Sequence, residues 1–176
     1  CMAEIAEELE QNQDAALFRK YSEGCKKAYQ AMAETSDHSL DTDRQARLVR
    51  PLAFALLNEK QKTYARERLI RALENYGWRL GTGFLSTPLI LDVLTEIDLQ
   101  AAYRLLENEQ IPGWLSMPRH GATTIWEHWD SQKEDGTFWS TDMNSFNHYA
   151  YGAVYDWIFG VALGIDIPDD GAGYQK

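Results

Sequence analysis

Apolar residues recur every three to four positions along most of the chain, which is the spacing of an amphipathic α-helix. The pattern is clearest where Ala65, Leu69 and Leu73 share one face and Gly77 follows as a stop signal. Together with cap and breaker residues, the pattern predicts an all-α fold with helices over residues 14–34, 42–57, 59–76, 86–97, 98–107 and 143–163.

Prolines, glycines and polar stretches divide this helical pattern. Pro51 lies inside the second predicted helix and has no N–H to donate, so we expect a kink or a boundary near Arg50. Asp14 is the expected N-cap of the first helix. Residues 77–88 are too rich in glycine and aromatic residues for a solvated loop, so they are predicted to line a site, whereas residues 108–141 are predicted to be irregular.

The last predicted helix differs from the others, because it is apolar or aromatic on nearly every side. Such a helix is usually buried all round. Residues 59–76 and 98–107 are one-sided by comparison, so we expect two concentric layers, with outer helices wrapped around inner ones. Residues 166–176 break the pattern with Pro and Gly and are predicted to begin a linker or a following module.

Composition and charge exclude several partners. The 176 residues carry a formal net charge of −10, so neither nucleic acid nor an anionic membrane surface is an expected partner. No run of 18 apolar residues predicts a transmembrane helix. The charged first ten residues are unlike a signal peptide and like the end of a helix, so we expect a piece of a longer protein. Cys1 and Cys25 are expected to be free thiols.

The segment GATTIWEHWD, residues 121–130, carries the strongest candidate for chemistry. Glu127 stands between Trp126 and Trp129, and a carboxylate that indole rings partly withdraw from water is a stronger base. Indole faces also stack on sugar rings, which favours a sugar or polyol substrate over a hydrophobic one. The alternative is a surface glutamate beside aromatic residues that cover the core.

Two polar residues occur near the start of the last predicted helix. Asn144 and His148 are four positions apart, so they would share one face of that helix. Polar groups at the end of a buried helix would lie at the mouth of a cleft. From the spacing alone, a hydrogen-bonded core histidine and a capping asparagine are the commoner arrangement.

Other catalytic patterns do not occur in the sequence. It has no HExxH, and His120 and His128 are eight positions apart in an irregular segment, so neither a metal nor another cofactor is expected. It has no GxSxG, and neither cysteine has a convincing histidine partner. GTGF at residues 81–84 lacks the GxGxxG spacing. The sequence therefore argues against a metallohydrolase, a serine hydrolase and a dinucleotide-binding enzyme.

Three blocks of sequence together resemble a known family. They are TGFLSTPLILDVLTE (82–96), GWLSMPRHGATTIWEHWD (113–130) and MNSFNHYAYGAVYDWIFGVALGI (143–165). In this order they are similar to the second half of the catalytic domain of bacterial α-L-rhamnosidases. The resemblance implies that residues 1–165 form part of an (α/α) toroid of the six-hairpin glycosidase type, incomplete on its N-terminal side.

The resemblance also implies a function. The family hydrolyses terminal α-L-rhamnose from glycosides with inversion and without a metal in the chemical step. Its TTIWE glutamate, matched by Glu127, is taken as the general base that activates water. Its SFNHYA histidine, matched by His148, contacts the bound sugar. Around these two, the expected substrate-binding residues are Asn144, Trp126, Trp129 and Phe84.

Inversion also requires a second carboxyl, the general acid, about 6.5–9.5 Å from the base. In the family it lies in an acidic, Trp-containing segment of the first half of the toroid, and the chain has no match to that segment. We therefore expect the isolated chain to be inactive and to need the remaining part of the same catalytic domain. Apolar surface left uncovered should make it self-associate. The carboxyls expected near the site, in hydrogen-bonding roles, are Asp92, Glu96, Asp130 and Asp142.

Three alternatives stay open. Another toroid glycosidase, acting on fucosides or uronosides, would be separated by product analysis. A non-catalytic helical module that keeps a sugar cleft would lack an acid segment upstream. A helical scaffold for protein partners predicts that Glu127→Gln changes no assay. The resemblance implies a bacterial protein, and the sequence favours the cytoplasm over secretion.

Overall fold

The computed structural model describes residues 1–142 and 144–165, and these residues are helical or irregular, with no strand. A single isolated bridge joins Gln132 and Phe138. The all-α prediction is confirmed. The main helices are α1 (Met2–Glu8), α2 (Asn12–Met32), α3 (Gln45–Ala53), α4 (Glu59–Asn75), α5 (Thr87–Ile97), α6 (Leu99–Leu106), α7 (Ser116–Arg119) and α8 (Val154–Trp157).

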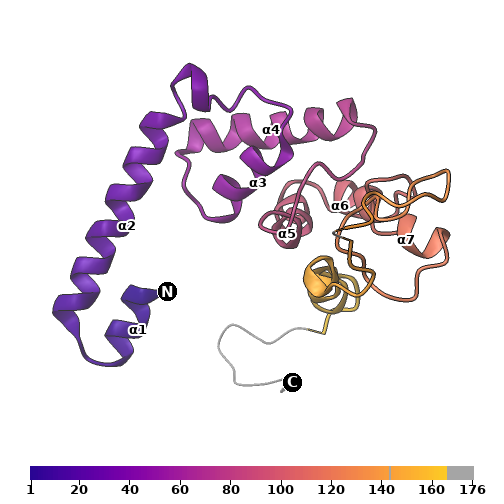
Figure 1. Cartoon of the computed structure of the whole chain (residues 1–176). Helices are drawn as coiled ribbons and strands as arrows, with labels where there is room; N and C mark the ends of the chain where they lie inside the picture. The colour runs from indigo at the N-terminus through magenta and orange to yellow at the C-terminus, as the bar shows by residue number, and fades with distance from the viewer. Residues whose placement is uncertain (143, 166–176) are drawn as a thin grey trace.

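Consecutive helices pair into hairpins. Helix α1 packs against α2, α3 against α4, and α5 against α6, while α3 and α8 both contact α5. Figure 1 shows these hairpins following one another around an open arch, with α1 and α2 as one arm. The arrangement is that of a partial (α/α) toroid, as the sequence predicts. Among the described residues, no helix combines the length and the apolar run that a membrane crossing requires.

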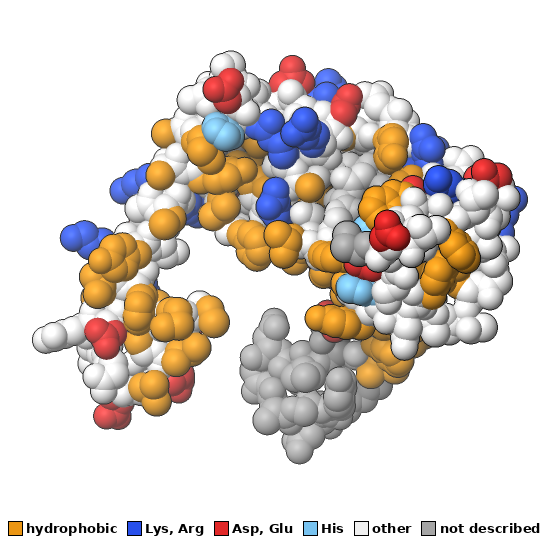
Figure 2. Space-filling model, in the orientation of Figure 1, with side chains coloured by type: hydrophobic (Ala, Val, Ile, Leu, Met, Phe, Trp, Pro, Cys, Tyr) orange, Lys and Arg blue, Asp and Glu red, His pale blue; other side chains and the backbone are white. Residues whose placement is uncertain are grey.

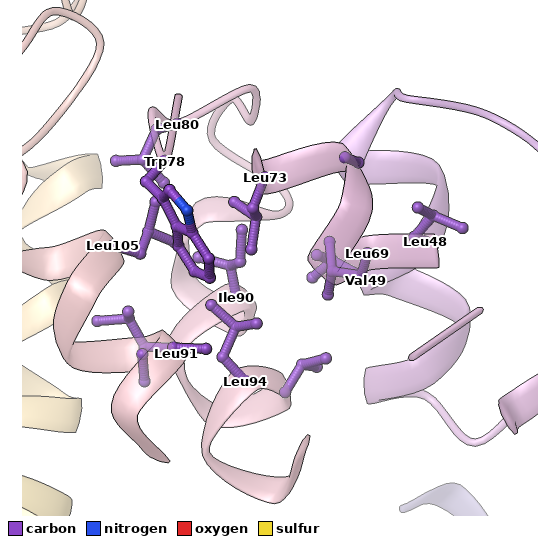
Figure 3. Packing of buried hydrophobic residues seen from close by; sticks show 14 of the residues in the cluster. Leu48, Val49, Leu69, Leu73, Trp78, Leu80, Ile90, Leu91, Leu94 and Leu105 are labelled. Carbon is purple, nitrogen blue, oxygen red and sulfur yellow. The ribbon is translucent and has the colours of Figure 1, made fainter. Parts of the chain in front are cut away.

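The core joins α3, α4, α5 and α6 through leucine-rich faces (Figure 3). Leu69 and Leu73 on α4 are fully buried, as their helical spacing predicts. Asn58 is the N-cap of α4, and its side chain accepts from the Gln61 N–H at 2.9 Å in a capping box. Gly77 follows the end of the helix with φ +66°. The other fully buried apolar residues of this core that Figure 3 labels are Leu48, Val49, Leu80, Ile90, Leu94 and Leu105.

Three boundaries of the first two predicted helices are wrong. Asp14 lies in the first turn of α2, which has Gln11 at its N-cap position. In place of the predicted helix 42–57, the structure has α3 over Gln45–Ala53, which is shorter at both ends. Pro51 does not stop α3 at Arg50; its ring removes a single N–H, and the helix continues to Ala53.

The last predicted helix is also wrong at its start. Helical backbone begins only at Tyr149, as a 3₁₀ turn (η2, Tyr149–Ala153) followed by α8 and a π-helical turn (η3, Ile158–Ala162). Residue 143 lies outside the described residues, as does the predicted linker 166–176. Residues 144–148 are irregular, so Asn144 and His148 do not share a helical face.

The last helical segment is not buried all round. Tyr151, Val154 and Trp157 are buried, but the Tyr149 and Tyr155 side chains are 89% and 57% exposed. The helix with neighbours on several sides is instead α5, which contacts α3, α6, α8 and η2.

Candidate active site

The segment that carries Glu127 runs beside the segment that carries His148, in the opposite direction. The Glu127 N–H donates to the carbonyl of Ser145 at 2.9 Å, and the His148 N–H donates to the carbonyl of Ile125 at 2.8 Å. These main-chain bonds are the reason that residues 145–148 do not enter the helix. They bring Glu127 and His148, the two residues proposed from sequence, into one short ribbon of two antiparallel segments, residues 124–127 and 145–148.

One oxygen of the Glu127 carboxylate is held by the main chain. The side chain is half-buried, and Oε2 accepts a hydrogen bond from the Ser145 N–H at 2.9 Å. Within the residues that the structure describes, Oε1 accepts no hydrogen bond from the protein. An oriented carboxylate with a free oxygen can take a proton from a water molecule.

Trp126 and Trp129 are only 4% and 8% exposed, because both indoles pack against protein rings. Trp126 meets Phe146 edge-on, with ring centroids 5.3 Å apart. Trp129 stacks on Tyr151 with centroids 3.8 Å apart, and its Nε1–H donates to the Thr82 carbonyl at 3.0 Å. These contacts fix the chain on both sides of the catalytic candidate. Stacking of either indole on a sugar stays a prediction.

Phe84 reaches the site from the connection between α4 and α5. Its ring is 43% exposed and stacks on the His148 ring, with centroids 5.2 Å apart and an angle of 15° between the planes. The residue that holds this connection, Gln45, is not among the site residues predicted from the sequence. The buried Gln45 side chain of α3 accepts from the Gly81 N–H and donates to the Arg79 carbonyl, both at 2.8 Å. A glutamine on the apolar face of a predicted helix was the available signal.

Asn144 is tied to the segment that follows Glu127. Its Nδ2 donates to the carbonyl of Ser131 at 2.9 Å, and Ser131 is fully buried. Its Oδ1 is buried and has no hydrogen-bond partner among the described residues. Asn144 therefore supports the local backbone, and a direct contact with substrate stays a prediction.

The pKa of Tyr151 is affected by the negative charges around the site. Burial raises the pKa of Tyr151, and the negative charges of Asp130 and Glu127 raise it further. Among the carboxyls suggested from sequence, Asp130 is thus linked to the Glu127 site. Glu96 instead pairs with Arg66 at 3.1 Å.

Two further observations concern the surroundings of the site. Across residues 1–142 and 144–165, no group of three or more His, Cys, Asp or Glu side chains is placed to hold a metal. An apolar cavity of about 280 Å³, lined by Trp114, Ile125 and Val154 among others, does not include Glu127 in its wall.

The partial toroid of helical hairpins, with an oriented carboxylate among aromatic rings on an irregular connection, fits the class of six-hairpin glycosidases that the sequence resemblance implies. Residues 1–162 match the family model described as the bacterial alpha-L-rhamnosidase 6 hairpin glycosidase domain, and the chain belongs to this family. The resemblance seen in the three sequence blocks is confirmed.

Relatives and solved structures agree with this assignment. The chain is 39% identical over 175 residues to the alpha-L-rhamnosidase of Streptomyces avermitilis, covering 99% of this chain and 17% of that protein. It is 36% identical over 165 residues to the alpha-L-rhamnosidase of Formosa agariphila, covering 93% of this chain and 18% of the relative. The chain therefore spans less than a fifth of the length of these relatives.

Two crystal structures have a similar fold. The Streptomyces avermitilis alpha-L-rhamnosidase complexed with L-rhamnose has a TM-score of 0.84 at 39% identity, covering 93% of this chain and 16% of that one. The alpha-L-rhamnosidase of Aspergillus terreus has a TM-score of 0.84 at 31% identity, covering 90% of this chain and 19% of that one.

Proposed function

We propose that this chain supplies the catalytic base and part of the sugar site of an α-L-rhamnosidase, which releases terminal α-L-rhamnose from glycosides with inversion. The observation that carries the proposal is the orientation of the Glu127 carboxylate, whose Oε2 accepts from the Ser145 N–H in the same ribbon as His148. The L-rhamnose complex of the Streptomyces avermitilis relative supports rhamnose as the sugar.

In the proposed reaction, Glu127 Oε1 takes a proton from water as the water oxygen bonds to the anomeric carbon. The bond from that carbon to the leaving oxygen breaks on the opposite face, and a general acid protonates the departing oxygen. This geometry needs two carboxyls about 6.5–9.5 Å apart, with water between the base and the sugar. His148, stacked on Phe84, can offer a ring nitrogen to a sugar hydroxyl.

The general acid is proposed to come from the remaining part of the catalytic domain. Hydrophobic side chains gather along the inner edge of the arch in Figure 2. Apolar residues of the last helical segment and the α4–α5 connection are well exposed, and covering them would remove this surface from water. These residues are Phe84, Leu85, Tyr149, Tyr155, Phe159 and Leu163.

Activity is tested with an aryl α-L-rhamnoside, by release of nitrophenol. The 176 residues alone should show no turnover, whereas a longer protein that contains them should be active. In that longer protein, Glu127→Gln should lower kcat by about 10²- to 10⁴-fold, the usual contribution of general base catalysis. The matched control is Glu134→Gln, because the Glu134 side chain is 79% exposed on the same irregular segment. Turnover by the 176 residues alone would contradict the proposed need for the rest of the catalytic domain.

Substrate and assembly are tested separately. Activity on fucosides or uronosides but not on rhamnosides would favour another toroid glycosidase, and sugar binding with no turnover in the longer protein would favour a binding module. In gel filtration, the isolated chain should elute as an associated species because of its exposed apolar residues. A compact monomer would contradict that proposal. The cytoplasmic location stays a prediction.

A further inference from the structure

The main chain, rather than a side chain, holds the carboxylate of Glu127. The Ser145 N–H donates to Oε2 at 2.9 Å, while the Glu127 N–H donates to the carbonyl of Ser145 at 2.9 Å. Together the two bonds link the backbone N–H and the carboxylate of Glu127 to the backbone carbonyl and N–H of Ser145. Rotation of the carboxylate away from this position would break the first bond.

Ser145 is itself fixed by its neighbours in the ribbon. The Thr124 hydroxyl donates to the carbonyl of Phe146, and the Phe146 ring meets Trp126 edge-on. The His148 N–H donates to Ile125. Because these contacts lie on the same pair of segments, they set the direction of the Ser145 N–H before any substrate binds.

We propose that the main-chain N–H of Ser145 is the positioning group of Glu127: it holds Oε2 and so leaves Oε1 as the atom that takes the proton from water. The inference rests on the proposed function. An N–H bond to a carboxylate is charge-assisted and therefore stronger than a bond between neutral groups. A fixed base oxygen also removes the need to orient the carboxylate during each turnover.

A matched pair of substitutions isolates this N–H in the longer, active protein. Ser145→Ala and Ser145→Pro both remove the hydroxyl, which accepts from the Asn147 N–H at 3.3 Å, but only proline removes the main-chain N–H. A third variant replaces the residue 145 amide by an ester, which removes the N–H without a proline ring.

We expect the alanine variant to keep the parent kcat. The ester and proline variants should lose about 10- to 100-fold in kcat, the range for a hydrogen bond to a charged group, with KM changed by less than about twofold. A purely structural role would change KM together with kcat, or would affect the alanine variant as well.

The outcomes separate this inference from the proposed function. An inactive parent protein would overturn the function itself. An active parent with an ester variant equal to the alanine variant in kcat would overturn the positioning role. If circular dichroism shows that the proline variant does not fold, the ester variant decides the question alone.

Discussion

Gln45 provides the most quantitative test of how the site is held. Its side chain, 1% exposed, bonds to the Arg79 carbonyl and the Gly81 N–H at 2.8 Å each, and these residues begin the turn that carries Phe84. Gln45→Met keeps the volume and removes both bonds. Each neutral hydrogen bond contributes about 1 kcal/mol net, so the loss of both costs about 2 kcal/mol. An unsatisfied group adds no further penalty, because water can reach the half-exposed Arg79 and the exposed Gly81.

Local opening of the turn is the quantity to measure. A loss of about 2 kcal/mol corresponds to about 30-fold faster amide exchange, since every 1.4 kcal/mol is tenfold. Hydrogen exchange read by mass spectrometry on peptides spanning residues 77–86 measures it directly. The control is Gln100→Met, an exposed glutamine on α6. If the amide exchange rate of Gln45→Met in these peptides is within about twofold of the parent rate, Gln45 does not stabilise the turn.

Three further predictions concern stability. Because the raised pKa of Tyr151 favours the neutral phenol in the folded state, its stabilisation is complete below the ordinary value of 10.0 and is lost as the pH rises above it. Thermal unfolding at pH 9–11 should show this loss in the parent, a smaller loss in Tyr151→Phe, and a loss equal to that of the parent in Tyr149→Phe, which keeps Tyr151. Trp129→Phe keeps an aromatic ring but loses the hydrogen bond to the Thr82 carbonyl, so the free energy of unfolding measured with urea should fall by about 1 kcal/mol. Asn58→Ala removes the capping box of α4 and should also cost about 1 kcal/mol, and an unchanged urea midpoint would contradict it.

Local sequence predicts much of the helical framework. The apolar stripe of α4, its following glycine and the short link between α5 and α6 are all signals within a few residues of each other, and the structure places these helices close to the predicted ranges. Boundaries fail where a tertiary contact competes with the helix. At residues 145–148, hydrogen bonds to the Glu127 segment take the main-chain groups that a helix would use.

The site is only partly readable from sequence. Glu127 and His148 are identifiable because their motifs resemble a family, but the partners that orient them come from distant positions. Ser145 acts through its backbone, so its residue type gives no signal. Gln45 acts across 36 positions of chain on Gly81, and no local pattern predicts that pairing.

The role of Glu127 is tested most directly by changing the leaving group. Fluoride leaves an α-L-rhamnosyl fluoride without protonation, whereas an alkyl rhamnoside needs a general acid to release its alcohol. A base is required for both substrates. In the longer protein, Glu127→Gln should therefore lower kcat by about 10²- to 10⁴-fold on both. A large loss on the alkyl rhamnoside with near-parent hydrolysis of the fluoride would show that Glu127 is the acid, and would contradict the proposed mechanism.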